Sequence, residues 1–341
     1  MIGNQLAYLL LGLGYTVLYL YTDSADRKVN TAAIWEPLKD RSLYDFRYLV
    51  SGLIDDDASG VTVASVNTII AAIANNVNTG YSEDEGRGDC IALCDIPRSA
   101  YVGKTTALAI EGIKQNVGTG NAYTAHFAPT VYYGGIEDTD YDNTELTASF
   151  HYLSCAAAAF SRYNEWFAVS GYTRGVSNMN IVGTSVKLGD AAVNALQKRS
   201  GSDKSVNLVI KLNDAYYLWG NRTGAAMTGN LTASNFLNIR QLCCSLKKTI
   251  YSTCRNLMFD PNSDLLWLNF CNAIRPMLEN MKANQGIADY RFEQQDTSVK
   301  AKLFAAIRII PIEAVEDFEI GVTLEDGFGE EAIQIKEYLG A

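Results

Sequence analysis

Residues 1–200 alternate between apolar runs of strand length and amphipathic runs of helix length, and this alternation limits the possible folds more than any other feature. The strand-like runs cover residues 15–21, 46–51, 89–96 and 122–133, and the helix-like runs cover 4–13, 61–75, 103–116 and 147–166. Strands separated by helices need crossover connections, which favour a largely parallel sheet with helices on its faces. We therefore predict an α/β domain over residues 1–200.

Residues 201–341 follow a different rhythm, in which strands and helices are segregated, and we predict an α+β domain there. Its expected elements are strands at 206–212 and 215–219, a helix at 236–258, a second helix starting at Asp260-Pro261, and a strand at 287–293. Proline is tolerated in the first turn of a helix and disrupts its interior. Pro276 is therefore expected to kink or end the second helix.

Residues 303–326 are typical of two strands in series, separated by Pro311. Residues 303–310 are almost wholly apolar, which predicts a strand buried on both faces. The second strand alternates, and its apolar positions share one side: Phe318, Ile320, Val322 and Leu324. Such a strand can pair within its own domain or complete the sheet of a neighbouring molecule, and both alternatives stay open at this point.

The charges of this acidic chain are segregated along the sequence. The net charge of −10 argues against nucleic acid as the main partner, because nucleic-acid surfaces attract basic proteins. Residues 313–337 contain nine acidic residues and one basic residue. The charged residues of the helix predicted at 236–258 are all basic: Arg240, Lys247, Lys248 and Arg255. Opposite charges on separate elements suit steering between subunits, and two solvated faces are the alternative interpretation. The apolar run at 6–21 is too short and glycine-broken for a membrane span, so we expect no membrane insertion.

No set of residues predicts catalysis. Residues 103–106 (GKTT) follow a strand as a phosphate-binding loop would, but Arg98 occupies the position where that loop needs a glycine. The two histidines, His126 and His151, lie in apolar runs and are interpreted as packing residues. The seven cysteines are scattered, which indicates neither a disulfide framework nor zinc spacing. The sequence thus predicts no catalytic, cofactor-binding or metal site, and a protein that is not an enzyme.

Four motifs in the second half resemble, in order, those of the contractile-tail sheath proteins of bacteriophages. The motifs are residues 218–223 (LWGNRT), 236–242 (FLNIRQL), 259–267 (FDPNSDLLW) and 311–318 (PIEAVEDF). They are similar to the family's WG-x-R-T, Y-V-N-V-R-R-L, F-E-P-N…L-W and P-x-x…E-F segments. Residues 35–41 and 172–176 fit the family more loosely. The resemblance implies a subtilisin-like α/β domain without a protease triad, then an α+β sheath domain over residues 201–341 with a terminal β-arm over about 316–341.

The resemblance also implies a function. Such subunits form hexameric rings stacked helically around a tail tube, and terminal strands from neighbours add to the C-terminal sheet. Contraction then drives the tube through the host cell envelope. The implied partners are other copies of the chain, the tail tube protein, and the baseplate and tail terminator proteins. The implied location is the virion tail, assembled in the host bacterial cytoplasm.

Within this picture, residues 303–310 are expected in the subunit's own core, and Phe318, Ile320, Val322 and Leu324 are expected to link subunits. The helix at 236–258 is expected to face the tube or the acidic C-terminal segment of a neighbour. Family members carry an N-terminal arm before the core helix. Either Met1 is the true start, or the chain is the C-terminal part of a longer product. The alternatives in function are the sheath of a phage-derived injection machine and, in a different class, an α/β hydrolase or nucleotide-binding enzyme.

Overall fold

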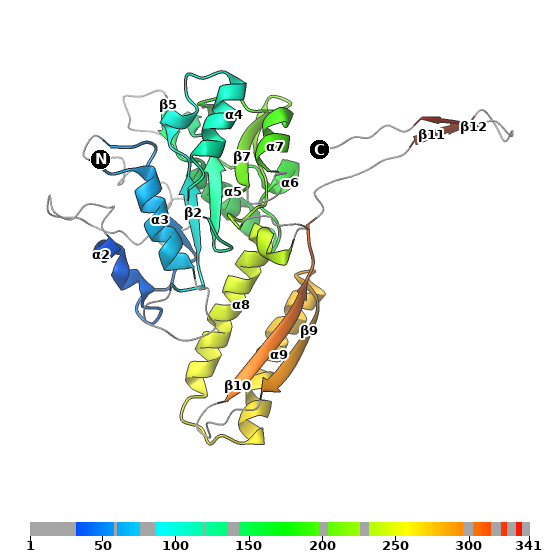
Figure 1. Cartoon of the computed structure of the whole chain (residues 1–341). Helices are drawn as coiled ribbons and strands as arrows, with labels where there is room; N and C mark the ends of the chain where they lie inside the picture. Colours follow the sequence, from blue (N-terminus) through cyan, green and yellow to red (C-terminus); the bar gives the residue numbers. More distant parts are fainter. Residues whose placement is uncertain are drawn as a thin grey trace.

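The computed structural model describes residues 32–57, 60–75, 86–118, 120–134, 143–197, 204–225, 232–295, 303–314, 322–325 and 332–335. They form an α/β body from which a long helical hairpin and a two-stranded sheet extend (Figure 1). The expected helix at 4–13 and strand at 15–21 lie outside the described residues. Within these ranges, no helix is both long enough and apolar enough to cross a membrane.

The main sheet has five strands in the order β1-β2-β3-β7-β8. Their bounds are β1 (Tyr48–Val50), β2 (Ile91–Asp95), β3 (Thr124–Ala128), β7 (Val206–Leu212) and β8 (Ala215–Trp219). The first four run parallel, and β8 runs antiparallel to β7. The surrounding helices are α2 (Ala32–Trp35), α3 (Val63–Ala74), α4 (Thr106–Gln115), α5 (Ala148–Phe160), α6 (Gly171–Arg174) and α7 (Asp190–Leu196). The predicted α/β class with a mostly parallel sheet is therefore confirmed.

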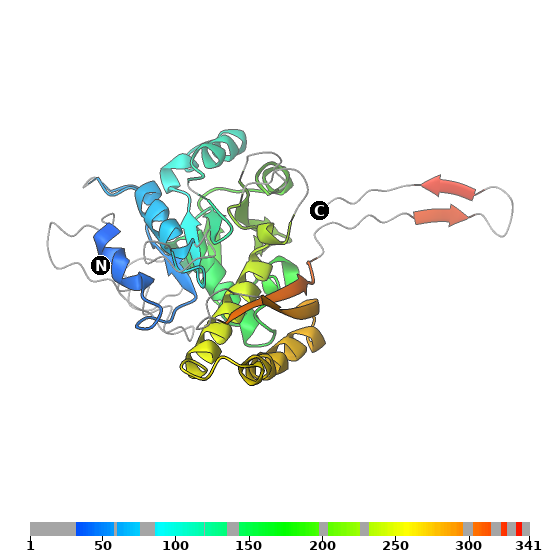
Figure 2. The same ribbon diagram turned by 60° about the horizontal axis from the view of Figure 1, so that its bottom comes forward.

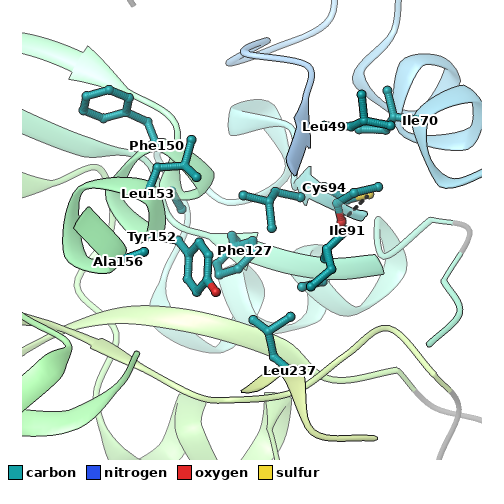
Figure 3. Close-up of a cluster of buried hydrophobic side chains, with 14 of the residues drawn as sticks. Leu49, Ile70, Ile91, Cys94, Phe127, Phe150, Tyr152, Leu153, Ala156 and Leu237 are labelled. Carbon is teal, nitrogen blue, oxygen red and sulfur yellow. Dashed lines mark hydrogen bonds between the residues drawn. The ribbon is translucent and has the colours of Figure 1, made fainter. Parts of the chain in front are cut away.

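Helices cover both faces of this sheet, because alternate side chains of each strand point to opposite sides. Cys94 of β2 faces Ile70 of α3 on one side, whereas Ile91 and Phe127 face Tyr152 of α5 on the other (Figure 3). The rings of Phe127 and Tyr152 lie 5.1 Å apart between centroids. Helices α4 and α7 pack on the same side as α3, against β7. The strands are thus buried on both faces, as their continuous apolar runs predict.

Residues 206–219, assigned above to the second domain, belong to the main sheet instead. Strand β7 pairs in parallel with β3, so that Val206 lies opposite His126. A two-residue turn with positive φ at Asn213 and Asp214 then folds β8 back onto β7. The chain leaves the sheet only after Trp219, and the change of rhythm at residue 201 does not mark a change of sheet.

A smaller antiparallel sheet lies beside the main one, in the order β5-β4-β6. Its strands are β4 (Val131–Gly134), β5 (Asn143–Leu146) and β6 (Ile181–Thr184). The predicted extended run at 122–133 is therefore divided between two sheets.

The C-terminal half consists of α8 (Leu237–Asn256), α9 (Asp264–Ala283), β9 (Ile287–Gln295) and β10 (Phe304–Pro311). The two helices form a hairpin, and the antiparallel pair β9–β10 packs against α9 (Figures 1 and 2). Pro276 lies inside α9 and does not end it. Ile274 and Leu278 on either side are fully buried, so packing outweighs the loss of one backbone hydrogen bond.

The expectation that residues 303–310 are buried on both faces is wrong. Ile307 and Ile309 pack on the core that contains α9, but the alternate residues point away from it. Ile310 is 60% exposed, and Ile312 beyond the strand is 42% exposed. The reason is that, among the described residues, one helical layer covers this sheet and its second face carries exposed side chains.

Two further short strands, β11 (Val322–Glu325) and β12 (Ala332–Ile335), pair with each other in antiparallel fashion. Both views show this hairpin standing apart from the rest of the structure (Figures 1 and 2). Of the four residues predicted to link subunits, Val322 and Leu324 lie in β11, whereas Phe318 and Ile320 lie outside the described residues.

Candidate functional site

Two of the sequence motifs meet at the junction between the main sheet and α8. The backbone amide of Leu237, at the start of α8, donates to the Asn221 carbonyl at 2.9 Å. Asn221 and Asn238 also pair: Nδ2 of Asn221 donates to Oδ1 of Asn238 at 2.7 Å, and the backbone amide of Asn238 donates back to Oδ1 of Asn221 at 3.1 Å. Both side chains are buried, so this reciprocal pairing satisfies groups that water cannot reach.

Asn207 of β7 ties the same motif to the sheet. Its Nδ2 donates to the carbonyls of His126 and Arg222, and its Oδ1 accepts from the Arg222 amide at 2.8 Å. Gly220 has a φ of +129°, and a Cβ there would lie 2.7 Å from Oδ1 of Asn207. A glycine is therefore required in the W-G-N-R-T segment for the backbone to pass this close to Asn207.

Trp166 closes the junction on its other side. Its indole Nε1 donates to the Asn284 carbonyl at 2.9 Å, where α9 ends, and its carbonyl accepts from Nδ2 of Asn238 at 3.0 Å. A Cβ on Gly286 would lie 3.1 Å from the Trp166 ring. The buried polar network joins the α/β body to α8 and α9, because breaking it would leave buried polar groups unpaired.

The predicted basic helix contributes to this junction. Nζ of Lys247 donates to the Tyr123 hydroxyl at 2.7 Å and to the Gly88 carbonyl at 3.0 Å. The Arg240 guanidinium lies 4.4 Å from the centroid of the Tyr123 ring. Both cations are thus directed at the chain's own α/β body.

Lys248 makes a similar contact one position further along α8. Its Nζ forms an ion pair with Asp45 and donates to the Phe46 carbonyl at 2.7 Å. The hydrogen bond from Lys248 lowers the pKa of Asp45. Arg255, by contrast, is exposed and lies 5.9 Å from the Tyr251 ring centroid. Arg240, Lys247 and Lys248 therefore contact the α/β body of their own subunit, whereas the contact of Arg255 is with its own helix.

The β9–β10 sheet has open edges. Neither strand has a second strand partner among the described residues, and the same holds for β11 and β12. Strand β8, at the edge of the main sheet, is different: the Leu218 amide donates to the Gly175 carbonyl at 2.8 Å, and Ser170 donates to the Leu218 carbonyl. Open strand edges are templates for pairing with another chain.

The residues weighed for catalysis have structural roles. Lys104 of the GKTT segment donates to the Ala100 carbonyl at 2.7 Å. His151 is buried, its Nδ1 is paired with the Tyr133 hydroxyl at 2.7 Å, and burial lowers its pKa to about 3. His126 is buried in β3. Across the described ranges, no group of three His, Cys, Asp or Glu side chains could hold a metal ion.

The role of one buried carboxyl, that of Asp95, is not predictable from the sequence. Asp95, at the end of β2, accepts from the Ser149 amide at 2.8 Å and from the Ser149 hydroxyl. It therefore stabilises the first turn of α5, whose N-cap is Thr147. Burial raises the pKa of Asp95 to about 7. Nothing in the local pattern signals this role, since the contact joins residues 54 positions apart.

Comparison with known proteins agrees with the motif resemblance. The chain is 22% identical over 267 residues to the tail sheath protein of Enterobacteria phage T4, which covers 75% of this chain and 38% of the T4 protein. The chain thus spans 38% of the length of that relative. No family model matches.

Solved structures share its fold, among them the following two. A chain of the anti-feeding prophage (AFP) baseplate superposes with a TM-score of 0.68 at 17% identity, covering 95% of this chain and 81% of that chain. The sheath complex of an extracellular contractile injection system, PVC, in its contracted state gives a TM-score of 0.63 at 16% identity, covering 84% of this chain and 72% of that chain. The resemblance to contractile sheath proteins is confirmed, and the fold is that of sheath subunits.

Proposed function

We propose that this chain is a structural subunit of a contractile sheath. In this proposal it polymerises as stacked hexameric rings around a tail tube and contracts to drive the tube through a cell envelope. The observation that carries the proposal is a firmly joined subunit whose C-terminal sheet has open strand edges. The sheath relatives and the sheath-like fold support it.

The open edges fit a role in linking subunits. A two-stranded hairpin such as β11–β12 is marginally stable alone in water, because it has little apolar surface to bury and few ladder hydrogen bonds. Adding it to the exposed edge of β10 in a neighbour would pair the backbone groups of both. In this arrangement Phe318, Ile320, Val322 and Leu324 form the linking strand, and residues 316–341 are the terminal β-arm of the family.

The firm junction fits the mechanical role. A sheath that changes its diameter must move whole subunits while its joints persist, so the parts of each subunit have to move together. The buried pairing of Asn221 with Asn238 and the Trp166 contact to α9 supply this connection. We further propose that the α/β body is the subtilisin-like domain of the family, without catalytic function. The proposed partners are other copies of the chain, the tube protein, and the baseplate and terminator proteins.

A sheath of a phage-derived injection machine is the second candidate. The solved structures with the same fold include the AFP baseplate and the contracted PVC sheath, and the latter is described as part of an extracellular contractile injection system. The proposed subunit mechanics are the same in both settings. An α/β hydrolase or nucleotide-binding enzyme has less support, since His151 and Lys104 are engaged in structural contacts.

Electron microscopy of the purified protein tests this proposal. The full chain should form rings or tubes, and a chain ending at Asp317 should stay folded by circular dichroism without assembling. A chain ending at Ile335, which keeps β11 and β12, serves as the matched control and should assemble. Tubes formed by the chain that ends at Asp317 would contradict the linking role of the arm.

A further inference from the structure

A surface groove with a volume of about 200 Å³ lies between the end of α5 and α6, on the α/β body. Its lining includes Arg162, Tyr163, Thr173, Arg174, Val176 and Asn178, together with two alanines of α5. Sites for cofactors and drug-sized ligands usually measure roughly 300–1,000 Å³. This groove is therefore of a size to receive one or two side chains of another polypeptide.

The groove is cationic. Its lining contains two arginines and no acid. The acid nearest in sequence to Arg162, Glu165, forms an ion pair with Arg47 and so belongs to another contact. A carboxylate entering the groove would thus meet two guanidinium groups without a competing acid among the lining residues.

Arg174 is held in a fixed position. Its Nε donates to the Ala168 carbonyl at 2.8 Å, and its guanidinium lies 5.3 Å from the Phe167 ring centroid and 5.6 Å from that of Tyr163. An arginine that is already ordered loses less side-chain entropy when it binds a carboxylate. The rim is partly apolar, because Tyr163 is 38% exposed and Val176 is 39% exposed.

We propose that this groove receives one or two side chains of residues 326–331 (DGFGEE) of a second copy of the chain. This segment connects β11 to β12 and carries three acids around a single aromatic residue, Phe328. The acids match Arg162 and Arg174, and the ring of Phe328 matches the apolar rim. Both views show β11–β12 standing apart from the body (Figures 1 and 2).

The inference deepens the proposed function and rests on it in one respect, since it assumes self-association. It is distinct from strand addition at β10, because it concerns side-chain recognition on the α/β body. The tip of the hairpin would occupy the groove, and its strands would remain available for backbone pairing. Charge recognition at the tip would then set which neighbour receives the arm.

A binding experiment tests the groove directly. A fluorescent peptide of residues 324–333 is titrated with the full chain, and binding is measured by anisotropy. Arg162→Glu should weaken binding about tenfold or more. Lys187→Glu, the same charge change at another exposed position, should leave binding unchanged. A peptide with Glu330→Lys and Glu331→Lys should bind wild type weakly and recover affinity for the Arg162→Glu chain.

Several outcomes would overturn the inference. Equal losses in Arg162→Glu and Lys187→Glu would indicate unspecific attraction, and unchanged binding in both would exclude the groove. A chain that stays monomeric and takes up the peptide only after removal of its own residues 326–341 would assign the groove to its own segment. Specific peptide binding without any tubes would support binding in the groove and contradict the proposed sheath function. Tubes without peptide binding would support the sheath function and contradict binding in the groove.

Discussion

The two sheets that flank α8 are completed to different degrees. The five-stranded sheet has helices on both faces, and the outer edge of β8 is occupied by the Gly175 carbonyl. The β9–β10 sheet has one covered face, and neither of its strands has a second strand partner in the described ranges. The first sheet is covered on both faces and closed within one chain at its β8 edge, and β1 at its other edge has no second strand partner among the described residues. In the second sheet both edges and one face present groups that another chain would complete.

This difference predicts that the residues that determine folding stability and those that determine assembly lie in different sheets. Substitutions in the first sheet should act on the folding of the single chain. Substitutions on the open side of the second should act on association and leave folding almost unchanged. The predictions below test that separation, in order of decreasing effect on folding.

The largest effect is expected at Phe127, in the middle of the main sheet. Its side chain is fully buried against Tyr152. Phe127→Ala should lower the free energy of unfolding by about 3–5 kcal/mol, because it removes a ring and leaves a cavity. Urea denaturation measures the loss. Phe259→Ala is the control, since Phe259 is 99% exposed and its removal should cost less than about 0.5 kcal/mol. Similar losses of unfolding free energy in the two variants would contradict the claim that the main sheet determines the stability of the single chain.

An intermediate effect is expected from the protonation of Asp95. Its pKa is raised to about 7 by burial, whereas a carboxyl in the unfolded chain titrates near pH 4. Between these values the native state holds a proton that the unfolded state has lost. The contribution of this group to stability is therefore greatest at the acidic end of that window and falls as pH rises from about 4 to about 7.

Denaturation of wild type and Asp95→Asn across this pH range checks the assignment. The variant should lack the part of the pH dependence that Asp95 causes, and it should show a flatter profile than wild type. Identical profiles in the two proteins would show that Asp95 does not titrate there. The charge pairs of the β9–β10 sheet among the described residues lie at the surface, such as Arg308 with Glu293, and such pairs contribute little to a pH profile of folding.

The smallest effect on folding is expected at Ile310, on the open side of β10. Ile310→Ser should change the free energy of unfolding by less than about 0.5 kcal/mol, because the side chain is already 60% exposed. It should raise the protein concentration needed for assembly. Ile309→Ser, one residue away on the packed side, should instead destabilise the subunit by more than about 1 kcal/mol. If Ile310→Ser assembled at the same protein concentration as wild type, the open side of β10 would not be part of the contact between subunits.

Much of the fold was predictable because the signals are local. The bounds of β7 and β8 match the predicted runs, and α3 follows its apolar stripe from a Thr62 capping box with Ser65. The membership of β7 in the main sheet was not predictable in this way. It depends on pairing Val206 with His126, which lie 80 positions apart and carry no local sign of each other.

The candidate site was predictable in its parts but not in its arrangement. The motifs at 218–223 and 236–242 were identified, yet their meeting through Asn221 and Asn238 is a tertiary contact. The role of Lys247 was also missed, because its partners are a tyrosine hydroxyl and a backbone carbonyl rather than an acid. Counting charges along a helix finds cations but not the uncharged groups that they contact.

Hydrogen–deuterium exchange of the dispersed and the assembled full chain tests the central claim most directly. If the β9–β10 sheet is completed by a neighbour, amides of β10 should exchange at least about tenfold more slowly after assembly. Amides of β2 and β3 should exchange at the same rate in both forms. Equal exchange of β10 in the dispersed and assembled protein would contradict the claim that its open edge links subunits.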